Sequence, residues 1–482
     1  MYKSLLKDAS LYSISSLIAR GFSLITVPIY TRLLKPADYG ALDLLSYLVI
    51  LVPLIMGAAL DQALARFYND AADDNERKRI SSSILLYTVF IFVPFIPLAL
   101  PLSSELAHGW LKGQVKEATI LLVFLLIWIN AIYTITNNQL IYSFKSRQFA
   151  ICSIGNTVFS VSTGFLLVAK FRLGVHGILL GQLLGISVFT LLSLYFGRIN
   201  YSLHFDWKTL RRMMAFSLPL VPGTLAFYLM QYVDRYAINQ MSGLDEVGLY
   251  GIGARVASLI NLFLMGFQGA WNPVIMSTYR EPGAPKKFRV VFNYYLFVVC
   301  AILVGLSLFG KEILLVLTTR TFSQGFIVIP LLLLAAILSS IGQYFTYGIL
   351  IAKKSGLRLY LNLMALVINA VLVYVLIPRF GMMGAALATV LAFVFLTVVG
   401  LALSQRYYHV PYRWRKIITA AVVAVMVSNL VFMVDFELTV RDELAKIGLI
   451  LVVLLFFARL LDIKLDPRLL GRARASLATQ VK

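Results

Sequence analysis

The sequence predicts an all-α polytopic membrane protein with about 14 transmembrane helices, as two six-helix lobes in parallel repeat plus two extra C-terminal helices. Three observations support this fold class. Of the 482 residues, 60% are hydrophobic and only 13% are charged, whereas roughly a quarter of a soluble domain is charged. Apolar runs of about 20 residues, each long enough to span about 30 Å of hydrocarbon, recur along the chain. Similar segments also recur about 207 residues apart.

Polar breaks with turn residues, such as Lys35-Pro36 and Pro282-Gly283, separate the predicted helices. In 311–350, Thr318-Thr319-Arg320 interrupts the apolar sequence, and a re-entrant or extended piece is an alternative to a regular span. The helices are expected at residues 11–34, 41–64, 81–102, 118–140, 148–169, 174–197, 214–240, 246–269, 289–310, 326–350, 357–377, 382–404, 416–434 and 444–462.

The distribution of basic residues predicts the orientation of these helices. The formal net charge is +21. If the N-terminus is cytoplasmic, the Lys and Arg residues in cytoplasmic segments outnumber those on the opposite side of the membrane by roughly three to one, as the positive-inside rule requires. Both termini are therefore predicted to be cytoplasmic. The first run, 11–34, is interpreted as a retained helix rather than a signal peptide, because it is too long and carries Arg20.

Three pairs of similar segments at one spacing indicate an internal repeat. They are LKPADYG (34–40) with SGLDEVG (242–248), KSR (145–147) with AKK (352–354), and FRLGVHG (171–177) with PRFGMMG (378–384). Because one period holds six spans, an even number, both halves have the same orientation in the membrane. Halves of this kind rock about a central site in many transporters.

The repeat predicts the domain organisation. An N-terminal lobe is expected at residues 1–197, a basic cytoplasmic linker at 198–212, a C-terminal lobe at 213–405, and two extra helices with a basic cytoplasmic tail at 406–482. Within the lobes, small residues at four-residue spacing, such as Gly177, are expected to let helices approach closely.

The sequence contains no pattern typical of an enzyme. A phosphate-binding loop, a nucleophile elbow, a dinucleotide fingerprint and metal-spaced histidines are all absent. Cys152 and Cys300 lie in apolar runs at a spacing that fits neither a metal site nor a redox pair. The protein is therefore predicted not to be an enzyme, with no metal, no cofactor and no nucleic-acid partner. The net positive charge is explained by the excess of Lys and Arg in the cytoplasmic segments of a membrane protein.

Charged residues inside the spans are the candidates for function, because a charge at membrane depth is costly and usually faces a cavity or a partner. Arg20 and Arg255 each lie about nine residues into a predicted helix, close to the midplane. They could form an anion-binding pair, since a guanidinium donates two parallel hydrogen bonds to a phosphate. The alternative is an internal ion pair with an acidic residue such as Asp43, Asp61 or Asp234.

Further candidates lie on two other predicted helices. Arg235, beside Asp234, could reach the cavity or the membrane surface, while Asp234 could bond a neighbouring helix. Tyr228 and Tyr232, one turn apart, form an aromatic face that could stack on a sugar or pack on a helix. Asp61 and Arg66 could act as a gate, or they could be ordinary charged residues at the end of a helix. The candidates for ion coupling or gating are thus Asp43, Asp61, Asp234 and Arg66.

Several segments resemble the polysaccharide transporter family, the Wzx-type O-antigen and capsule flippases of the multidrug/oligosaccharidyl-lipid/polysaccharide exporter superfamily. The segments RGFSLITVPIYTRLLKPADYGALDLLSYL (20–48) and VDRYAINQMSGLDEVGLYGIGARVASL (233–259) are similar to the first helices of each half. FRLGVHGILLGQLLG (171–185) and PRFGMMGAALATVLA (378–392) are similar to the glycine-containing start of each half's last helix.

The resemblance implies two six-helix lobes that move an undecaprenyl-diphosphate-linked oligosaccharide across the bacterial inner membrane by alternating access, for O-antigen, lipopolysaccharide or exopolysaccharide synthesis. It implies cationic cavity residues, a role that Arg20 and Arg255 fit by position, and coupling to an H⁺ or Na⁺ gradient. Membrane lipids and other polysaccharide assembly proteins are the expected partners. A drug/cation antiporter of the MATE type and a lipid II flippase are the alternatives. Against the antiporter, the deepest charges are arginines, which favour an anionic cargo.

Overall fold

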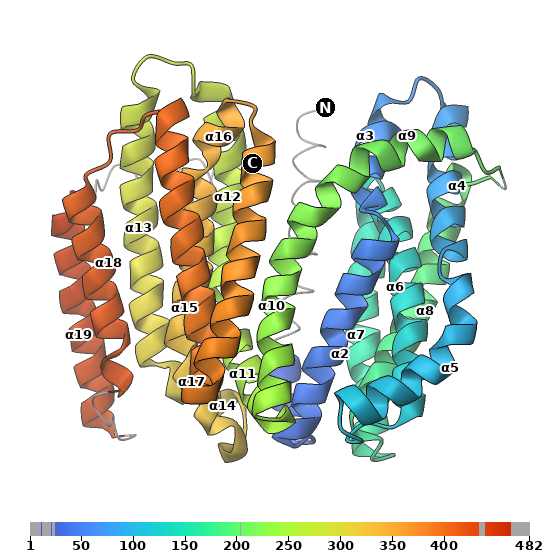
Figure 1. Ribbon diagram of the computed structural model, residues 1–482, viewed down its shortest axis with the longest axis horizontal. Coiled ribbons are helices and arrows are strands. Elements are labelled where there is room, and N and C mark those ends of the chain that lie inside the picture. The colour runs from blue at the N-terminus through green and yellow to red at the C-terminus, as the bar shows by residue number, and fades with distance from the viewer. Residues whose placement is uncertain (1–10, 12–20, 22–24, 203, 433–438, 464–482) are drawn as a thin grey trace, which may run out of the picture. The chain divides into compact units, whose positions relative to one another are not determined.

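The computed structural model describes residues 11, 21, 25–202, 204–432 and 439–463, and no strand occurs among them. Ten helical stretches in these residues are long and apolar enough to cross a membrane. An eleventh candidate is the pair α11 (Leu244–Ala257) and α12 (Ile260–Thr278), which is bent by 46°. The predicted all-α membrane fold is confirmed (Figure 1).

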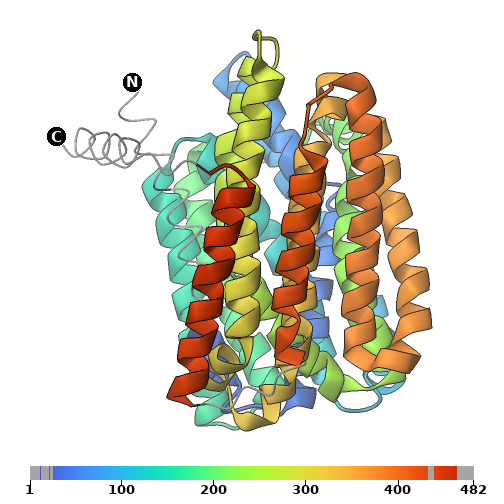
Figure 2. The same ribbon diagram turned by 90° about the vertical axis from the view of Figure 1, so that its left-hand side faces the viewer.

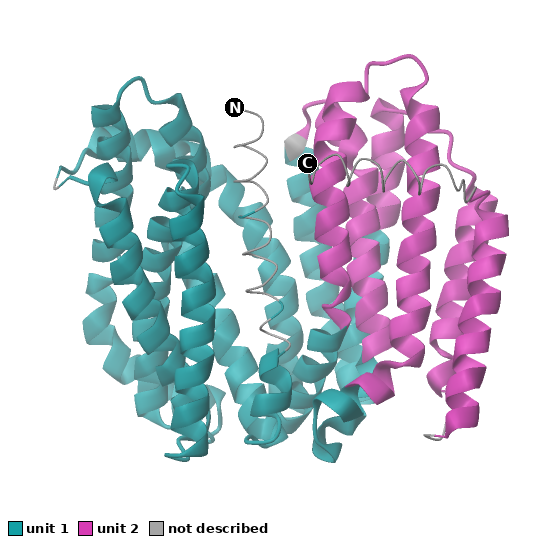
Figure 3. Cartoon of the chain, turned by 180° about the vertical axis from the view of Figure 1, so that it is seen from behind, with its two compact units in different colours: residues 1–256, 314–328, 356–396 teal, residues 257–313, 329–355, 397–482 magenta. Residues whose placement is uncertain are grey.

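The chain forms two compact units (Figure 3). Unit 1 comprises residues 1–256, 314–328 and 356–396, and unit 2 comprises 257–313, 329–355 and 397–482. These units are defined by contacts rather than by the repeat, and the division into lobes at 1–197 and 213–405 stays a prediction.

Unit 1 contains most of the helices before residue 257. They are α2 (Pro36–Met56), α3 (Leu60–Asp70), α4 (Asp74–Phe90), α5 (Ile96–Glu105), α6 (Glu117–Tyr142), α7 (Ser146–Ala169), α8 (Gly174–Gly197), α9 (Trp207–Ser217), α10 (Val221–Met241) and most of α11. The bounds of α6, α7 and α8 agree with the predicted spans to within a few residues, because each is an uninterrupted apolar run between polar breaks.

The remaining helices are distributed between the two units. They are α12, α13 (Ala284–Leu308), α14 (Gly310–Leu317), η5 (Arg320–Val328), α15 (Ile329–Phe345), α16 (Tyr347–Ile351), α17 (Ser355–Tyr407), α18 (Trp414–Ser428) and α19 (Val440–Leu460). The interruption predicted at Thr318-Thr319-Arg320 is confirmed, because α14 ends and η5 begins there.

The predicted helix 41–64 is wrong in its bounds. The structure ends α2 at Met56 and begins a separate helix, α3, at Leu60. Pro53 lies inside α2, and Ala58 and Ala59 both have φ of +50°, so the helix cannot continue through them. Asp61 therefore opens α3 instead of lying near the end of a long span. Of the first predicted helix, 11–34, residues 25–30 are helical, and most of the remainder lies outside the described residues.

Positive φ marks the turn before the last helix of each repeat. Gly174 and Gly381, which the repeat aligns, both have φ of +53°, a conformation that a residue with a Cβ adopts only at a cost. In the second half this turn breaks α17 into two arms, which correspond to the two predicted spans 357–377 and 382–404.

Another repeated glycine pair lies in a helix crossing inside unit 1. Gly40 on α2 and Gly248 on α11 face each other: a Cβ on Gly40 would lie 2.1 Å from the carbonyl oxygen of Leu244, and one on Gly248 would lie 2.0 Å from that of Pro36. The two similar motifs thus form the starts of two helices in direct backbone contact. This close approach is what fixes α2 beside α11, where both carry charged residues.

Close packing also joins α7 to α8, as predicted for the spaced glycines. A Cβ on Gly181 would lie 2.4 Å from the backbone nitrogen of Gly164, and one on Gly185 would lie 2.0 Å from the Ser160 hydroxyl. Small residues let two helices approach in this way, which increases their van der Waals contact in a membrane.

The segment before α9 is held by polar contacts. Asp206 caps the helix, since its carboxylate accepts hydrogen bonds from the backbone of Lys208 and Thr209. The hydrogen bond from the Thr209 hydroxyl holds the pKa of Asp206 below its usual value. This cap sets the start of the helix that leads into α10.

In unit 2, α18 and α19 pack against α13 (Figure 2). Lys446 on α19 is buried, forms ion pairs with Glu312 and Glu443, and lies 5.6 Å from the Phe309 ring centre. A buried lysine needs such partners, so this ion cluster fixes α19 to the unit. Unit 2 also contains an aromatic stack that includes Phe267, Trp271, Tyr295 and Tyr344.

Candidate functional site

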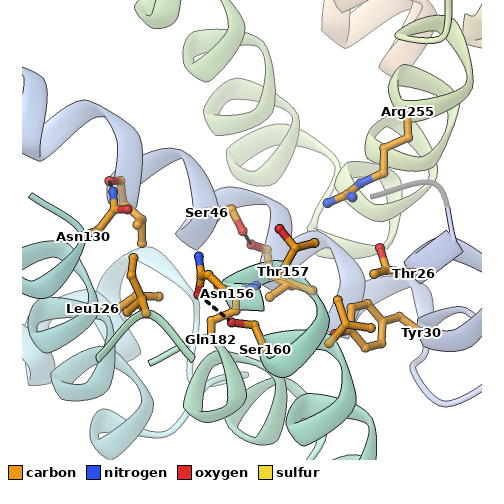
Figure 4. Close-up of a pocket in the computed structure, with 14 residues that line it drawn as sticks. Thr26, Tyr30, Ser46, Leu126, Asn130, Asn156, Thr157, Ser160, Gln182 and Arg255 are labelled. Atoms are coloured by element: carbon orange, nitrogen blue, oxygen red, sulfur yellow. Dashed lines mark hydrogen bonds between the residues drawn. The ribbon is translucent and has the colours of Figure 1, made fainter. Parts of the chain in front are cut away.

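A polar cavity of about 280 Å³ opens between helices of unit 1 (Figure 4). Its walls come from the helical segment at residues 25–30 and from α2, α6, α7, α8 and α11. The described residues that line it are Thr26, Tyr30, Leu42, Ser46, Val49, Leu126, Asn130, Asn156, Thr157, Ser160, Val161, Gln182, Ile186 and Arg255.

Arg255 provides the charge of this cavity. Its side chain extends from α11 toward the side chains of the other helices (Figure 4). The guanidinium carbon lies 5.5 Å from the ring centre of Tyr39, a cation–π contact that supports the side chain from behind. No carboxylate occurs among the described lining residues, so Arg255 is the charged side chain of the described lining.

Amide and hydroxyl groups line the rest of the cavity. The Ser160 hydroxyl donates to the Asn156 side-chain oxygen at 3.1 Å, and the Asn130 amide donates to the Val49 carbonyl at 3.1 Å. The Ser46 and Thr157 hydroxyls donate to carbonyls one turn earlier in their own helices. These bonds orient the side chains while leaving acceptor capacity on the hydroxyl oxygens.

Arg235 is paired rather than directed at the cavity or the membrane surface. Its Nε donates to an oxygen of Asp43 at 2.6 Å, and its Nη1 donates to the Gln231 carbonyl at 2.9 Å. Both charged residues are buried, and the guanidinium lies 4.5 Å from the Tyr47 ring centre and 5.1 Å from that of Tyr250. Arg235 therefore forms an internal ion pair with Asp43, an arrangement that was considered from the sequence for Arg20 and Arg255 but not for Arg235.

Asp234, the neighbour of Arg235, bonds two other helices. Its carboxylate accepts hydrogen bonds from the Thr389 hydroxyl at 2.6 Å, the Tyr250 hydroxyl at 3.0 Å and the Asn369 amide at 3.2 Å. Asp234 is 1% exposed and Asn369 is fully buried. The side-chain oxygen of Asn369 has no hydrogen-bond partner among the described residues, so an unsatisfied acceptor stands beside the carboxylate.

Both predicted tyrosines pack on neighbouring aromatic rings. Tyr232 stacks on Tyr236 with ring centres 6.2 Å apart and lies 6.4 Å from Trp110, and Tyr228 meets Phe227 edge to face at 5.7 Å. Neither tyrosine is among the described residues that line the cavity. In unit 1 these rings therefore contribute packing contacts.

The other predicted candidates lie away from the cavity or outside the described residues. Asp61 is half-buried at the start of α3. Arg66 is exposed, lies 3.7 Å from a carboxylate oxygen of Asp70 and rests over the Phe216 ring at 4.6 Å. Arg20 lies outside the residues that the structure describes.

Sequence reasoning missed the neutral part of the site. It concentrated on charged residues, whereas Asn130, Asn156 and Gln182 line the cavity and Asn369 and Thr389 contact Asp234. Amide side chains in the middle of apolar runs were the available signal, because an unsatisfied polar group is costly in hydrocarbon. The hydrophobic pattern does not reveal which amides converge on one cavity.

The helices and the cavity define a class: a multi-pass helical membrane protein with a polar, cation-bearing cavity within its helical bundle. The chain belongs to the polysaccharide biosynthesis protein family, whose sequence model matches residues 5–279. The family resemblance noted from the sequence is thereby confirmed.

Known proteins resemble this chain over most of its length, in sequence or in fold. The chain is 21% identical over 423 residues to the "Probable low-salt glycan biosynthesis flippase Agl15" of Haloferax volcanii, covering 87% of each chain. Its fold is similar to that of the lipid II flippase MurJ in an inward closed conformation, with a TM-score of 0.76, 15% identity, and 93% and 98% of the two chains covered. An inward-facing MATE multidrug transporter matches with a TM-score of 0.65, 15% identity, and 82% and 94% coverage.

Proposed function

We propose that this protein is a flippase that moves an undecaprenyl-diphosphate-linked oligosaccharide from the cytoplasmic to the outer leaflet of a bacterial inner membrane. The observation that carries the proposal is Arg255, a cation that faces a cavity lined by amides and hydroxyls. A lipid diphosphate supplies the anion, and its glycan supplies hydroxyl groups. The family and the glycan flippase among the relatives support this choice of cargo.

Alternating access is the proposed mechanism. Gly40 and Gly248, which the repeat aligns, lie at a direct helix crossing, and Gly174 and Gly381 share one backbone conformation. These features support two halves of equal orientation that can rock about a site at membrane depth. In this scheme Arg255 holds the diphosphate while access changes from one side to the other, and Arg20 acts with it.

The cavity favours this cargo over a cationic drug. A drug/cation antiporter needs a carboxylate at its site, because an unpaired organic cation is strongly disfavoured at membrane depth. The described lining of the cavity contains one arginine and no carboxylate. A lipid II flippase remains the second candidate, because its fold is similar and its cargo is also a lipid diphosphate.

The proposed function is tested by transport in reconstituted vesicles. Purified protein is expected to accelerate flipping of a fluorescent undecaprenyl-diphosphate oligosaccharide at least about tenfold over protein-free vesicles, which is about 1.4 kcal/mol of barrier. The flipping rate of lipid II and the accumulation of a cationic dye are measured in the same vesicle system. Faster movement of the dye than of the lipid-linked oligosaccharide would overturn the proposal. A preference for lipid II would select the second candidate.

Asp234 is the proposed site of ion coupling. Its buried carboxylate and the unsatisfied oxygen of Asn369 together offer acceptors to a proton or a small cation. Asp234→Asn is nearly isosteric and keeps hydrogen-bonding groups toward Thr389 and Tyr250, but it removes the charge. We expect this variant to flip cargo at an unchanged rate without a gradient and to lose the acceleration that an imposed H⁺ or Na⁺ gradient gives the wild type.

Asp61→Asn is the matched control for this experiment, since Asp61 is the other acidic coupling candidate that forms no ion pair with a described residue. If Asp234→Asn still responds to both gradients while Asp61→Asn does not, coupling belongs to Asp61. Comparing the two gradients in the wild type identifies the coupling ion.

A further inference from the structure

Basic residues from two helices surround one carboxylate at an end of unit 2. Asp462 follows α19, and one of its oxygens accepts hydrogen bonds from Lys416 at 2.6 Å and from Arg413, both at the start of α18. The hydrogen bond from Lys416 holds the pKa of Asp462 below its usual value, and the charge of Arg289 on α13 acts in the same direction. A single carboxylate therefore neutralises only part of the positive charge that α13 and α18 bring together.

Both helix ends carry charge of the sign that the helix dipole disfavours. Basic residues stabilise the C-terminus of a helix and acidic residues the N-terminus. Here Arg413, Arg415 and Lys416 lie at the start of α18, and Asp462 follows the end of α19. Asp462 also has φ of +57°, a conformation that a residue with a Cβ adopts only at a cost. Local helix stability does not explain these charges, which indicates that they serve a contact between helices or with an anion.

The helix α13 holds these two ends in place. Both α18 and α19 pack against it (Figure 1). Asn293 on α13 is 8% exposed, and its amide donates at 3.2 Å to the carbonyl of Leu461, directly before Asp462. The backbone at the end of α19 is therefore fixed to α13 by a bond that does not use the Asp462 side chain.

The basic groups remain accessible at this end. In their ion pairs with Asp462, the side chain of Arg413 is 50% exposed and that of Lys416 is 31% exposed. Arg415 and Arg459 are exposed as well. By sequence, residues 464–482 add five Lys or Arg and one Asp. The positive excess is therefore a property of the whole segment, described or not.

Apolar surfaces continue from these basic residues along α18 and α19. On α18, Ile418 and Val422 are exposed and lie about one and two turns after Arg415, on the same face. On α19, Phe456 is exposed and lies about one turn before Arg459. Exposed apolar side chains on helices of a membrane protein are suited to contact with acyl chains, so each basic end adjoins a lipid-facing surface.

Trp414 indicates the depth of the basic residues in the membrane. It is 38% exposed, and its ring lies 5.3 Å from that of Tyr412 and 6.1 Å from that of Phe345. Tryptophan is enriched at the level of the lipid headgroups. Its neighbours Arg413 and Arg415 lie at the same level, above the apolar surface of α18. An anion that meets them there and also contacts that surface is a lipid.

We propose that the ends of α13, α18 and α19 form a binding site for the headgroup of an anionic phospholipid from the surrounding membrane. Arg289, Arg413 and Lys416 hold its phosphate, and its acyl chains lie along the exposed faces of α18 and α19. The positive-inside rule predicts that this end is cytoplasmic, where basic pockets between helices bind such headgroups. The site concerns a membrane lipid rather than the cargo, so it does not depend on the proposed function.

The test measures lipid binding to the full-length protein in detergent by native mass spectrometry. Phosphatidylglycerol is the anionic probe, and phosphatidylcholine with the same acyl chains is the zwitterionic one. We expect the wild type to bind phosphatidylglycerol at least about tenfold more tightly. Arg413→Gln and Lys416→Gln should each weaken its binding about fivefold, which is about 1 kcal/mol for one basic residue at a membrane surface, and leave phosphatidylcholine unaffected. Equal affinity of the wild type for both lipids would overturn the site.

Arg66→Gln is the matched control, because it removes the same charge from an exposed ion pair with Asp70 in unit 1. It should bind phosphatidylglycerol as the wild type does. If it weakens binding as much as Arg413→Gln, the lipid responds to the net charge of the protein and the assigned site is wrong. Undecaprenyl diphosphate is titrated as well. If Arg413→Gln weakens binding of that lipid and not of phosphatidylglycerol, the choice of occupant is overturned.

Asp462→Asn distinguishes a lipid site from a contact that only joins α18 to α19. Asparagine is nearly isosteric and tolerates positive φ, and the bond from Asn293 to Leu461 does not involve the changed side chain. Without the competing carboxylate, Lys416 and Arg413 are available to a phosphate, so we expect about fivefold tighter binding of phosphatidylglycerol. Unchanged or weaker binding in this variant would show that the basic residues serve the helix contact alone.

Discussion

Removing one partner of the Asp43–Arg235 ion pair is expected to destabilise the protein by about 3–5 kcal/mol, because it leaves an uncompensated charge buried in the protein. The side chains are 8% and 6% exposed, so water cannot replace the lost partner. Asp43→Leu and Arg235→Met should each lower the thermal unfolding midpoint in detergent and reduce the yield of monodisperse protein on size-exclusion chromatography.

The double variant Asp43→Leu with Arg235→Met is the control for this prediction. Replacing a buried pair by apolar groups of similar volume is often neutral or stabilising, so the double variant should recover most of the stability that each single variant loses. Exposed Arg66→Met, whose pair with Asp70 lies at the surface, should change the midpoint little. A double variant as unstable as the sum of both singles would contradict the assigned pair.

Arg255→Ala is expected to slow flipping of the lipid-linked oligosaccharide by about 30- to 150-fold, which corresponds to about 2–3 kcal/mol for charge-assisted hydrogen bonds to a phosphate. Arg255→Lys should recover only part of the rate, since a point charge lacks the planar fork of a guanidinium. The rates are measured in reconstituted vesicles with equal amounts of correctly inserted protein.

Arg379→Ala serves as the matched control because it removes the same charge from an exposed position that does not line the cavity. It should flip cargo at the wild-type rate. If Arg255→Ala transports as fast as Arg379→Ala, Arg255 does not hold the cargo.

Most helices could be predicted because their cause is local. A run of about 20 apolar residues needs no distant partner to be stable in hydrocarbon, where each backbone group is satisfied inside the helix. The predicted spans 118–140, 148–169 and 174–197 match α6, α7 and α8 for this reason. The helix predicted at 41–64 failed because the conformations of Ala58 and Ala59, both at φ +50°, are set by tertiary packing rather than by propensity.

Arg235 and Arg255 differ in the residues that surround them in the folded protein. Arg235 and Arg255 are both intramembrane arginines in the same half of the sequence, and the same cost applies to each. The structure places Arg235 against Asp43, 192 residues away, and Arg255 at a cavity lined by α2, α6, α7 and α8. No local pattern separates the two arginines, since the difference lies entirely in which helices pack beside them.

By itself, the sequence determined the membrane class, the helical runs, the repeat and the family, because hydrophobic length and motif spacing are properties of the chain alone. The tertiary structure decided which charges are neutralised and which face a cavity, and it gathered Asn130, Asn156 and Gln182 from three helices into one wall. The physical reason is that pairing and convergence are long-range. They depend on close helix crossings such as the one at Gly40 and Gly248, which bring distant residues into contact.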